Sequence, residues 1–195
     1  MINRIIISTP RPFPVALRYN NIRSYVLTAT FILLAVMTPC VFHQFHLAGP
    51  TFLPMHIFVL SAGLLFGWRA GLIVGVLTPF TSYAVSGMPA LSVLPQIVVE
   101  LSAYGSIAGI LREKYHLRTM WSLLGAMIGG RVALFLAVMI IYLIAERSYS
   151  PLGLETSPFA AFWSTIRQGW PGIITQLIST PAIVLLAGKL AGRKH

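Results

Sequence analysis

The stretch that decides the fold is TFLPMHIFVLSAGLLFGWRAGLIVG (Thr51–Gly75), in which Arg69 is the only charged residue. Apolar residues fill both sides of Gly67-Trp68-Arg69. Taken as one block, the apolar sequence would extend for about 32 residues, whereas one straight crossing of the bilayer needs about 20. We therefore predict that the chain turns at Arg69 and that a separate helix lies on each side of it.

The composition identifies an integral membrane protein. Of the 195 residues, 56% are hydrophobic and 9% are charged, whereas soluble domains are about 25% charged. The single cysteine, Cys40, excludes a disulfide framework and a cysteine-based zinc site. The net charge of +10 is also typical of nucleic-acid-binding proteins, but the basic residues lie in short clusters between apolar segments. We therefore expect a lipid bilayer, and no nucleic acid, around this chain.

Six apolar segments have the length and composition of membrane spans, so the fold class is an all-α integral membrane protein with a six-transmembrane-helix bundle. The predicted spans are Tyr25–Phe42, Pro54–Phe66, Ala70–Val85, Ser92–Leu111, Met120–Ala145 and Trp170–Leu190. This divides the chain into an N-terminal arm (1–24), a six-helix transmembrane domain (25–190) and a basic tail (191–195).

The positions of lysine and arginine predict the orientation of the bundle. Basic residues favour the cytoplasmic loops of membrane proteins, and here they gather on alternate connections. The basic residues of these connections are Arg4, Arg11, Arg18, Arg23, Arg69, Arg112, Lys114, Arg118, Lys189, Arg193 and Lys194. Both termini are therefore expected in the cytoplasm (N-in/C-in).

Small residues recur at a spacing of four in Gly67, Gly71 and Gly75. This spacing places them on one helix face, where helix backbones approach closely in lipid. Two interpretations remain open: internal packing of the bundle, or a docking surface for another membrane subunit.

Two charged residues, Glu100 and Arg131, fall inside predicted spans. At 1.5 Å per residue, Glu100 lies about 12 Å from the outer end of its span and Arg131 about 16 Å from the inner end of the next. In a hydrocarbon core about 30 Å thick these depths nearly coincide, so we predict an ion pair between the helices. The pair either fixes helix register only or also holds a polar ligand.

Further candidate ligand-binding residues lie in the outer half of the bundle. Gln96 and Tyr104 are one turn from Glu100 on the same helical face, and His56 stands where the second helix begins. His43 and His46 have a ligand-like spacing, but no carboxylate or cysteine lies nearby to complete a metal site. We therefore predict no metal.

The stretch FWSTIRQGWPG places Trp163, Arg167 and Trp170 at helical spacing before Pro171, a residue that suits the first turn of a helix. The N-terminus of that helix would carry partial positive charge toward the outside, with Gln176 one to two turns further in. A polar or anionic ligand suits this place, although an interfacial aromatic belt also accounts for the tryptophans.

Catalytic motifs are missing from the sequence. It contains no HExxH, GxSxG or CxxC motif and no phosphate-binding glycine loop followed by lysine. We predict no catalytic residues and no cofactor bound by this chain, so active transport would draw on a partner or an ion gradient. Two alternatives remain: an intramembrane enzyme acting on a lipid or isoprenoid, with Glu100 and His56 as acid and base, and a scaffold without a ligand.

Several stretches together resemble one known family. In order they are FLPMHIFVLSAGLLFGWRAGLIVGVLTPF, SGMPAL, VELSAYGSIAGILRE, GGR and GWPGIITQLISTPAIVLL. They resemble the substrate-binding S components of energy-coupling factor (ECF) vitamin transporters over nearly the whole chain after the N-terminal arm.

The resemblance implies a six-helix subunit of the bacterial cell membrane that captures a vitamin or related small molecule from outside. It also implies a transmembrane ECF coupling protein and two cytoplasmic ATPases as partners, which would use the ATP. The implied ligand residues are Glu100, Tyr104, Arg131, Arg167 and Gln176, with His56 and the loop above it as a lid. Gln96 and Trp163 join them from the residue analysis.

The resemblance also implies docking of the first three helices on the coupling protein. Gly67, Gly71 and Gly75 are the implied docking residues, together with Ala29 and Ala35, which are six residues apart where the family often has alanines at a spacing of four.

Because cationic residues outnumber anionic ones near the site, a carboxylate- or phosphate-bearing ligand is expected.

Overall fold

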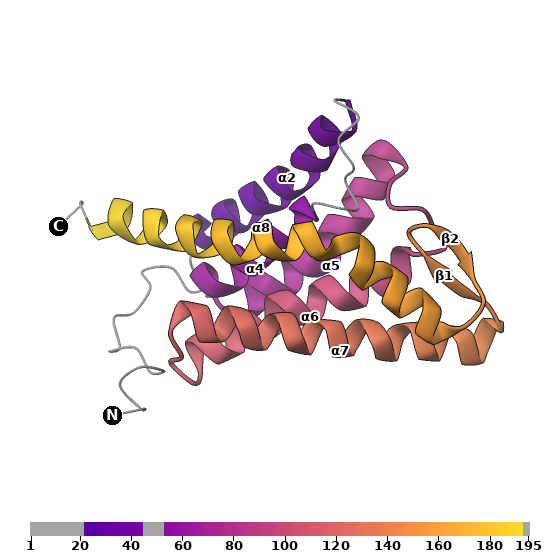
Figure 1. Ribbon diagram of the computed structural model, residues 1–195. Coiled ribbons are helices and arrows are strands. Elements are labelled where there is room, and N and C mark those ends of the chain that lie inside the picture. Colours follow the sequence, from indigo (N-terminus) through magenta and orange to yellow (C-terminus); the bar gives the residue numbers. More distant parts are fainter. Residues whose placement is uncertain (1–21, 45–52, 193–195) are drawn as a thin grey trace.

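The structure is a computed structural model that describes residues 22–44 and 53–192. Its described residues form six helices and one short hairpin, which confirms the predicted helical bundle (Figure 1). The helices are α2 (Ile22–Gln44), α4 (Pro54–Phe66), α5 (Trp68–Ser86), α6 (Leu94–Glu113), α7 (Thr119–Ala145) and α8 (Pro158–Gly192), and the strands are β1 (Ser148–Ser150) and β2 (Gly153–Glu155). The predicted N-terminal arm and basic tail fall almost entirely outside these residues.

Three described helices are long and apolar enough to cross a membrane, over Leu94–Glu113, Thr119–Ala145 and Pro158–Ala187. Two shorter apolar helical segments, Ser24–Pro39 and Pro54–Phe66, accompany them. In Figure 1, α7 and α8 run along the length of the molecule and the β1–β2 hairpin lies at one end. We call this the hairpin end; α4 and α6 also begin there.

The predicted turn between the second and third spans is confirmed, and it lies at Gly67. This residue adopts φ 87° and ψ 176°, a backbone region that glycine enters without steric cost. The Glu113 side chain, from the last turn of α6, accepts a hydrogen bond from the Trp68 N–H at 3.3 Å. It thereby satisfies one of the free amides at the start of α5. Arg69 lies in this first turn, 5.4 Å from the Trp68 ring centroid.

The glycine face of α5 packs inside the bundle. A Cβ at Gly71 would overlap the Gly105 carbonyl of α6, and one at Gly75 would lie 2.5 Å from the Leu101 carbonyl oxygen. The two backbones are therefore in contact, which only residues without side chains permit. Of the two interpretations of this spacing, internal packing describes the structure. Gly71 and Gly75 are buried against α6, and contact of these residues with a partner stays a prediction.

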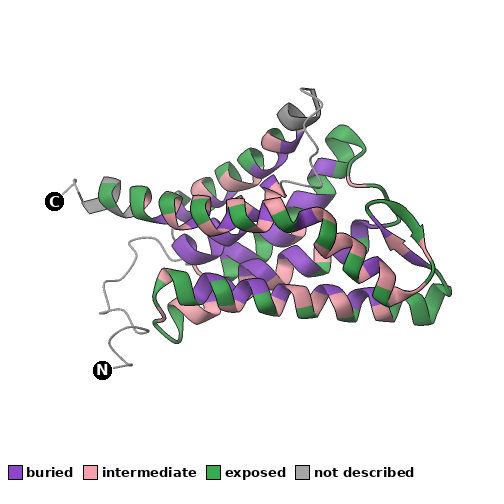
Figure 2. Cartoon of the chain, in the orientation of Figure 1, coloured by how far each residue is buried: buried purple, intermediate pink, exposed green. Residues whose placement is uncertain are grey.

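The two alanines predicted to dock on the partner differ in exposure. Ala35 is fully buried within the chain, whereas Ala29 is exposed on α2. Figure 2 shows that buried residues concentrate on the inner faces of the helices and that exposed residues follow their outer faces. Those outer faces carry large apolar side chains such as Leu72, Ile128 and Leu185, as expected where a helix meets lipid.

The last helix begins earlier than predicted. Helix α8 starts at Pro158 and has Pro171 in its interior, so the predicted helix N-terminus at Trp170-Pro171 is wrong. The start signal is Ser157, whose hydroxyl accepts a hydrogen bond from the Ala160 N–H at 3.1 Å. Serine as N-cap followed by proline at the first helical position is a favoured start. No helix terminus with free amides therefore faces a ligand at Trp170.

Candidate functional site

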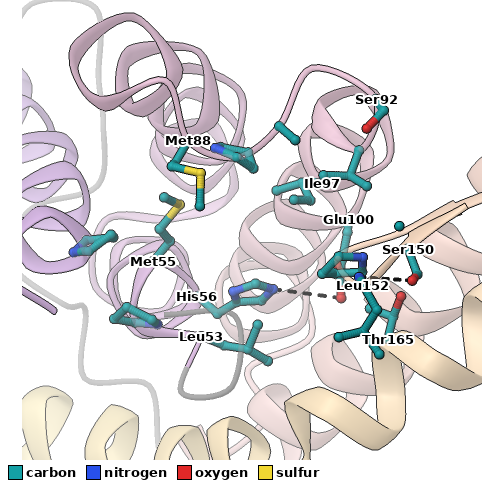
Figure 3. A pocket seen from close by; sticks show the side chains of 17 residues that line it. Leu53, Met55, His56, Met88, Ser92, Ile97, Glu100, Ser150, Leu152 and Thr165 are labelled. Atoms are coloured by element: carbon teal, nitrogen blue, oxygen red, sulfur yellow. Dashed lines mark hydrogen bonds and ion pairs between the residues drawn. The ribbon is translucent and has the colours of Figure 1, made fainter. Parts of the chain in front are cut away.

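A cavity of about 320 Å³ opens at the hairpin end of the bundle (Figure 3). Its walls come from the end of α2, the start of α4, the segment before α6, α6 itself, the β1–β2 hairpin and α8. Most lining residues are apolar, proline or glycine. The polar lining residues are His56, Ser92, Glu100, Ser150 and Thr165. We call this cavity the hairpin-end pocket.

The predicted ion pair between α6 and α7 is present. Arg131 Nη1 donates a hydrogen bond to Glu100 Oε1 at 2.7 Å. The Glu100 side chain is 3% exposed and that of Arg131 is 14% exposed, so water screens the pair little. Each charge at this depth would be costly alone, and the pairing removes most of that cost. Glu100 therefore contributes a carboxylate to the pocket wall that is already neutralised from behind.

His56 stands beside this ion pair in the first turn of α4. Its Nε2 lies 3.8 Å from Glu100 Oε1, within ion-pair range but beyond a hydrogen bond. The imidazole packs edge-on against the Tyr104 ring, with 5.3 Å between centroids. Neither ring nitrogen has a hydrogen-bond partner in the described part of the chain, although both are buried. A buried polar group without a partner is uncommon, so the imidazole is available to a ligand.

Tyr104 and Arg131 line a second hollow on the other side of the ion pair. This groove of about 540 Å³ lies between α7 and α8, and its other walls are apolar residues such as Phe135 and Phe162. Tyr104 is fully buried, and its ring occupies the space that a side chain at Gly130 would need. Neither residue lines the hairpin-end pocket; Arg131 contacts Glu100 and Tyr104 packs against His56.

The two glutamines differ in their surroundings. Gln96 is buried, and its Nε2 donates a hydrogen bond to the Tyr149 carbonyl at 2.9 Å, which ties α6 to the hairpin. Gln176 is fully buried on α8, and neither of its amide atoms has a hydrogen-bond partner among the described residues. Neither residue lines the pocket.

Trp163 and Arg167 lie on the surface of α8. Trp163 is 56% exposed, Arg167 is exposed, and neither lines the hairpin-end pocket. Of the eight residues predicted to bind substrate, the structure thus brings together His56, Glu100, Tyr104 and Arg131. The first outer loop, predicted as a lid, largely falls on residues 45–52, outside the described residues. Substrate contact by any of these residues stays a prediction.

Several pocket residues were missed in the sequence. They come from the Met88–Ala90 segment, the hairpin residues Ser150–Gly153 and Thr165. The hairpin pairs Ser148 with Glu155 and Ser150 with Gly153. Proline and glycine two residues apart, Pro151 and Gly153, are a turn signal, but strands of three residues give too short an alternation to detect.

Comparison with known proteins identifies the family. Residues 22–184 match the family described as "ECF transporter, substrate-specific component". The chain belongs to this family. It is therefore an all-α, multi-pass membrane protein and a transporter subunit, not an enzyme, and it works with an ECF module and a substrate. No curated protein and no solved structure gives a significant match to the sequence.

The family match also excludes the alternative that the chain is an intramembrane enzyme, because the members of this family are transporter subunits. His56 and Glu100 do lie together, as that alternative required. Within residues 22–44 and 53–192, no three histidine, cysteine or acidic side chains come together as a metal site.

Proposed function

We propose that this chain captures a vitamin or related small molecule in the hairpin-end pocket and delivers it through an ECF coupling protein driven by two ATPases. The observation that carries the proposal is a concave, mostly apolar pocket with a few convergent polar groups, which is the usual form of a small-molecule site. His56 would contact the ligand directly and Glu100 would border it. Arg131 and Tyr104 would hold these two in position.

The proposed orientation places the hairpin end outside the cell and both termini in the cytoplasm. At the opposite end of the bundle lie basic residues in the first turn of α5, the last turns of α6 and α8 and the N-cap of α7, namely Arg69, Arg112, Lys189 and Arg118. Basic residues favour the cytoplasmic side. The pocket would then receive its ligand from outside, and ATP would be hydrolysed by the partner subunits.

The docking surface proposed for the coupling protein is the outer face of α2, α4 and α5. Because Gly71, Gly75 and Ala35 are buried, this surface would use exposed side chains instead. Ala29 on α2 and Leu72 on α5 are exposed residues of this kind.

The proposal is tested by native mass spectrometry of the full chain, purified gently in detergent from cells grown in a rich medium. A co-purifying small molecule is expected with the wild type and with Arg167→Gln, a surface change outside the pocket. It should be lost in His56→Ala. A protein that carries no ligand and takes up none from a vitamin panel, or a ligand retained equally in all three, would contradict this function.

A further inference from the structure

We propose that the ligand of the hairpin-end pocket is uncharged, compact and largely apolar, with one head group that both donates and accepts a hydrogen bond. This inference rests on the proposed function, because it specifies the substrate class of the same pocket. It follows from three properties of the pocket wall: its charge balance, its free hydrogen-bonding groups and its size.

Among the described residues, the pocket wall carries no charged or ionisable group besides Glu100 and His56. Glu100 is paired with Arg131 at 2.7 Å, so the two charges cancel. The carboxylate- or phosphate-bearing ligand expected from the sequence depended on surplus cationic residues near the site. Arg131 lies behind Glu100 and Arg167 is exposed on α8, and neither lines the pocket, so its described wall presents no such surplus.

An anionic ligand would also meet the Glu100 carboxylate in a poorly screened environment. Like charges at close range in a buried site repel strongly, because the local dielectric constant is low. A cationic ligand would have to share the Glu100 carboxylate with Arg131, which already neutralises it. An uncharged ligand avoids both costs.

The free hydrogen-bonding groups point to His56 as the recognition residue. Neither of its ring nitrogens has a partner among the described residues, and a neutral imidazole offers one N–H donor and one acceptor. Two of the other lining hydroxyls already donate within the chain. Thr165 Oγ1 donates to the Ala161 carbonyl at 2.8 Å, and Ser150 Oγ donates to Glu155 at 2.8 Å. An amide, lactam or similar group, with donor and acceptor side by side, complements the imidazole.

The size and wall chemistry define the rest of the ligand. A volume of about 320 Å³ is near the lower limit for small-molecule pockets, so a compact ligand fits and a large multi-ring one does not. Met55, Met88, Ile97 and Leu152 contribute apolar side chains to the pocket wall (Figure 3). Methionine side chains adapt to the shape of an apolar group, which suits a ring or short chain.

The test separates ligands by charge before they meet the protein. A vitamin-rich yeast extract is divided by ion exchange at pH 7 into uncharged, anionic and cationic small-molecule pools. Each pool is added to the purified full chain, freed of endogenous ligand, and adducts are counted by native mass spectrometry. We expect the uncharged pool to give at least a tenfold higher adduct fraction than either charged pool. Nicotinamide and nicotinate serve as a defined amide–acid pair in the same assay.

Two variants test the cause of the preference. Glu100→Gln leaves the Arg131 charge unpaired, so the ratio of uncharged to anionic adducts should fall at least tenfold. Arg167→Gln changes the net charge by one unit away from the pocket and should leave the ratio unchanged. If Glu100→Gln fails to give a monodisperse protein, the three wild-type pools decide alone.

The outcomes distinguish this inference from the proposed function. Adducts mainly from a charged pool, or equally from all pools, would overturn the uncharged ligand and leave the function as a binding subunit intact. No adduct from any pool would overturn both.

Discussion

The Glu100–Arg131 ion pair leads to a specific prediction about stability. Both side chains are buried, and each charge offsets most of the free-energy cost of burying the other. In Arg131→Met, the Glu100 carboxylate stays 3% exposed and loses its only cationic partner within 3 Å among the described residues, with His56 3.8 Å away. In Glu100→Leu, the guanidinium loses the only hydrogen bond that Arg131 makes among the described residues. Removing one partner of a buried pair costs about 3–5 kcal/mol.

Replacing both partners by apolar residues should cost far less than either single change. A buried pair exchanged for well-packed apolar side chains is often neutral in stability, and in lipid the charges are themselves costly. We expect Arg131→Met and Glu100→Leu each to lose about 3 kcal/mol, and the double variant about 1 kcal/mol. The double variant should therefore be more stable than either single variant.

The assay is unfolding of the purified protein in mixed detergent micelles, titrated with dodecyl sulfate and followed by tryptophan fluorescence. Thermal unfolding gives a second readout, with each single variant melting roughly 6–12 °C below the wild type at about 2–4 °C per kcal/mol. Arg167→Met is the matched control, since it removes an exposed arginine, and should stay within about 0.5 kcal/mol. Two results would refute a buried ion pair in the membrane. One is a free energy of unfolding of the single variants within 1 kcal/mol of the wild type. The other is a loss of stability in the double variant equal to the sum of the two single losses.

Three further predictions concern packing, the hairpin and the pocket. Gly71→Leu places a side chain against the Gly105 backbone and should destabilise the bundle by about 3 kcal/mol or more; an unchanged melting temperature would mean that α5 and α6 are not in contact. Gln96→Leu removes the hydrogen bond to Tyr149 and should speed amide exchange of residues 148–155 by about tenfold while leaving α7 unchanged. Ala90→Trp adds an indole at the pocket wall and should abolish ligand adducts without shifting the melting temperature; retained adducts would place the ligand elsewhere.

The internal packing of α5 shows where sequence reasoning stopped. Glycines at intervals of four residues give the same sequence pattern whether their helix face packs against a helix of the same chain or of another protein. The backbone contacts with Gly105 and Leu101 decide this question, and they depend on how two helices cross. The start of α8 shows a different limit. Ser157-Pro158 and Trp170-Pro171 are both plausible start signals, and only the Ser157 cap tells which one is used.

The sequence by itself determined the membrane class, the helical segments, the turn beside Arg69 and the pairing of Glu100 with Arg131. These features follow from properties that depend on local order alone: apolar length, charge density and depth along a helix. Only the tertiary structure decided which residues share the pocket. The pocket wall is built from six segments that are separate in the sequence. Short elements such as strand β1 or the side chain of Met88 come to line it only when the helices pack together. For the same reason, only the structure shows that Arg131 contacts Glu100 and does not itself line the hairpin-end pocket.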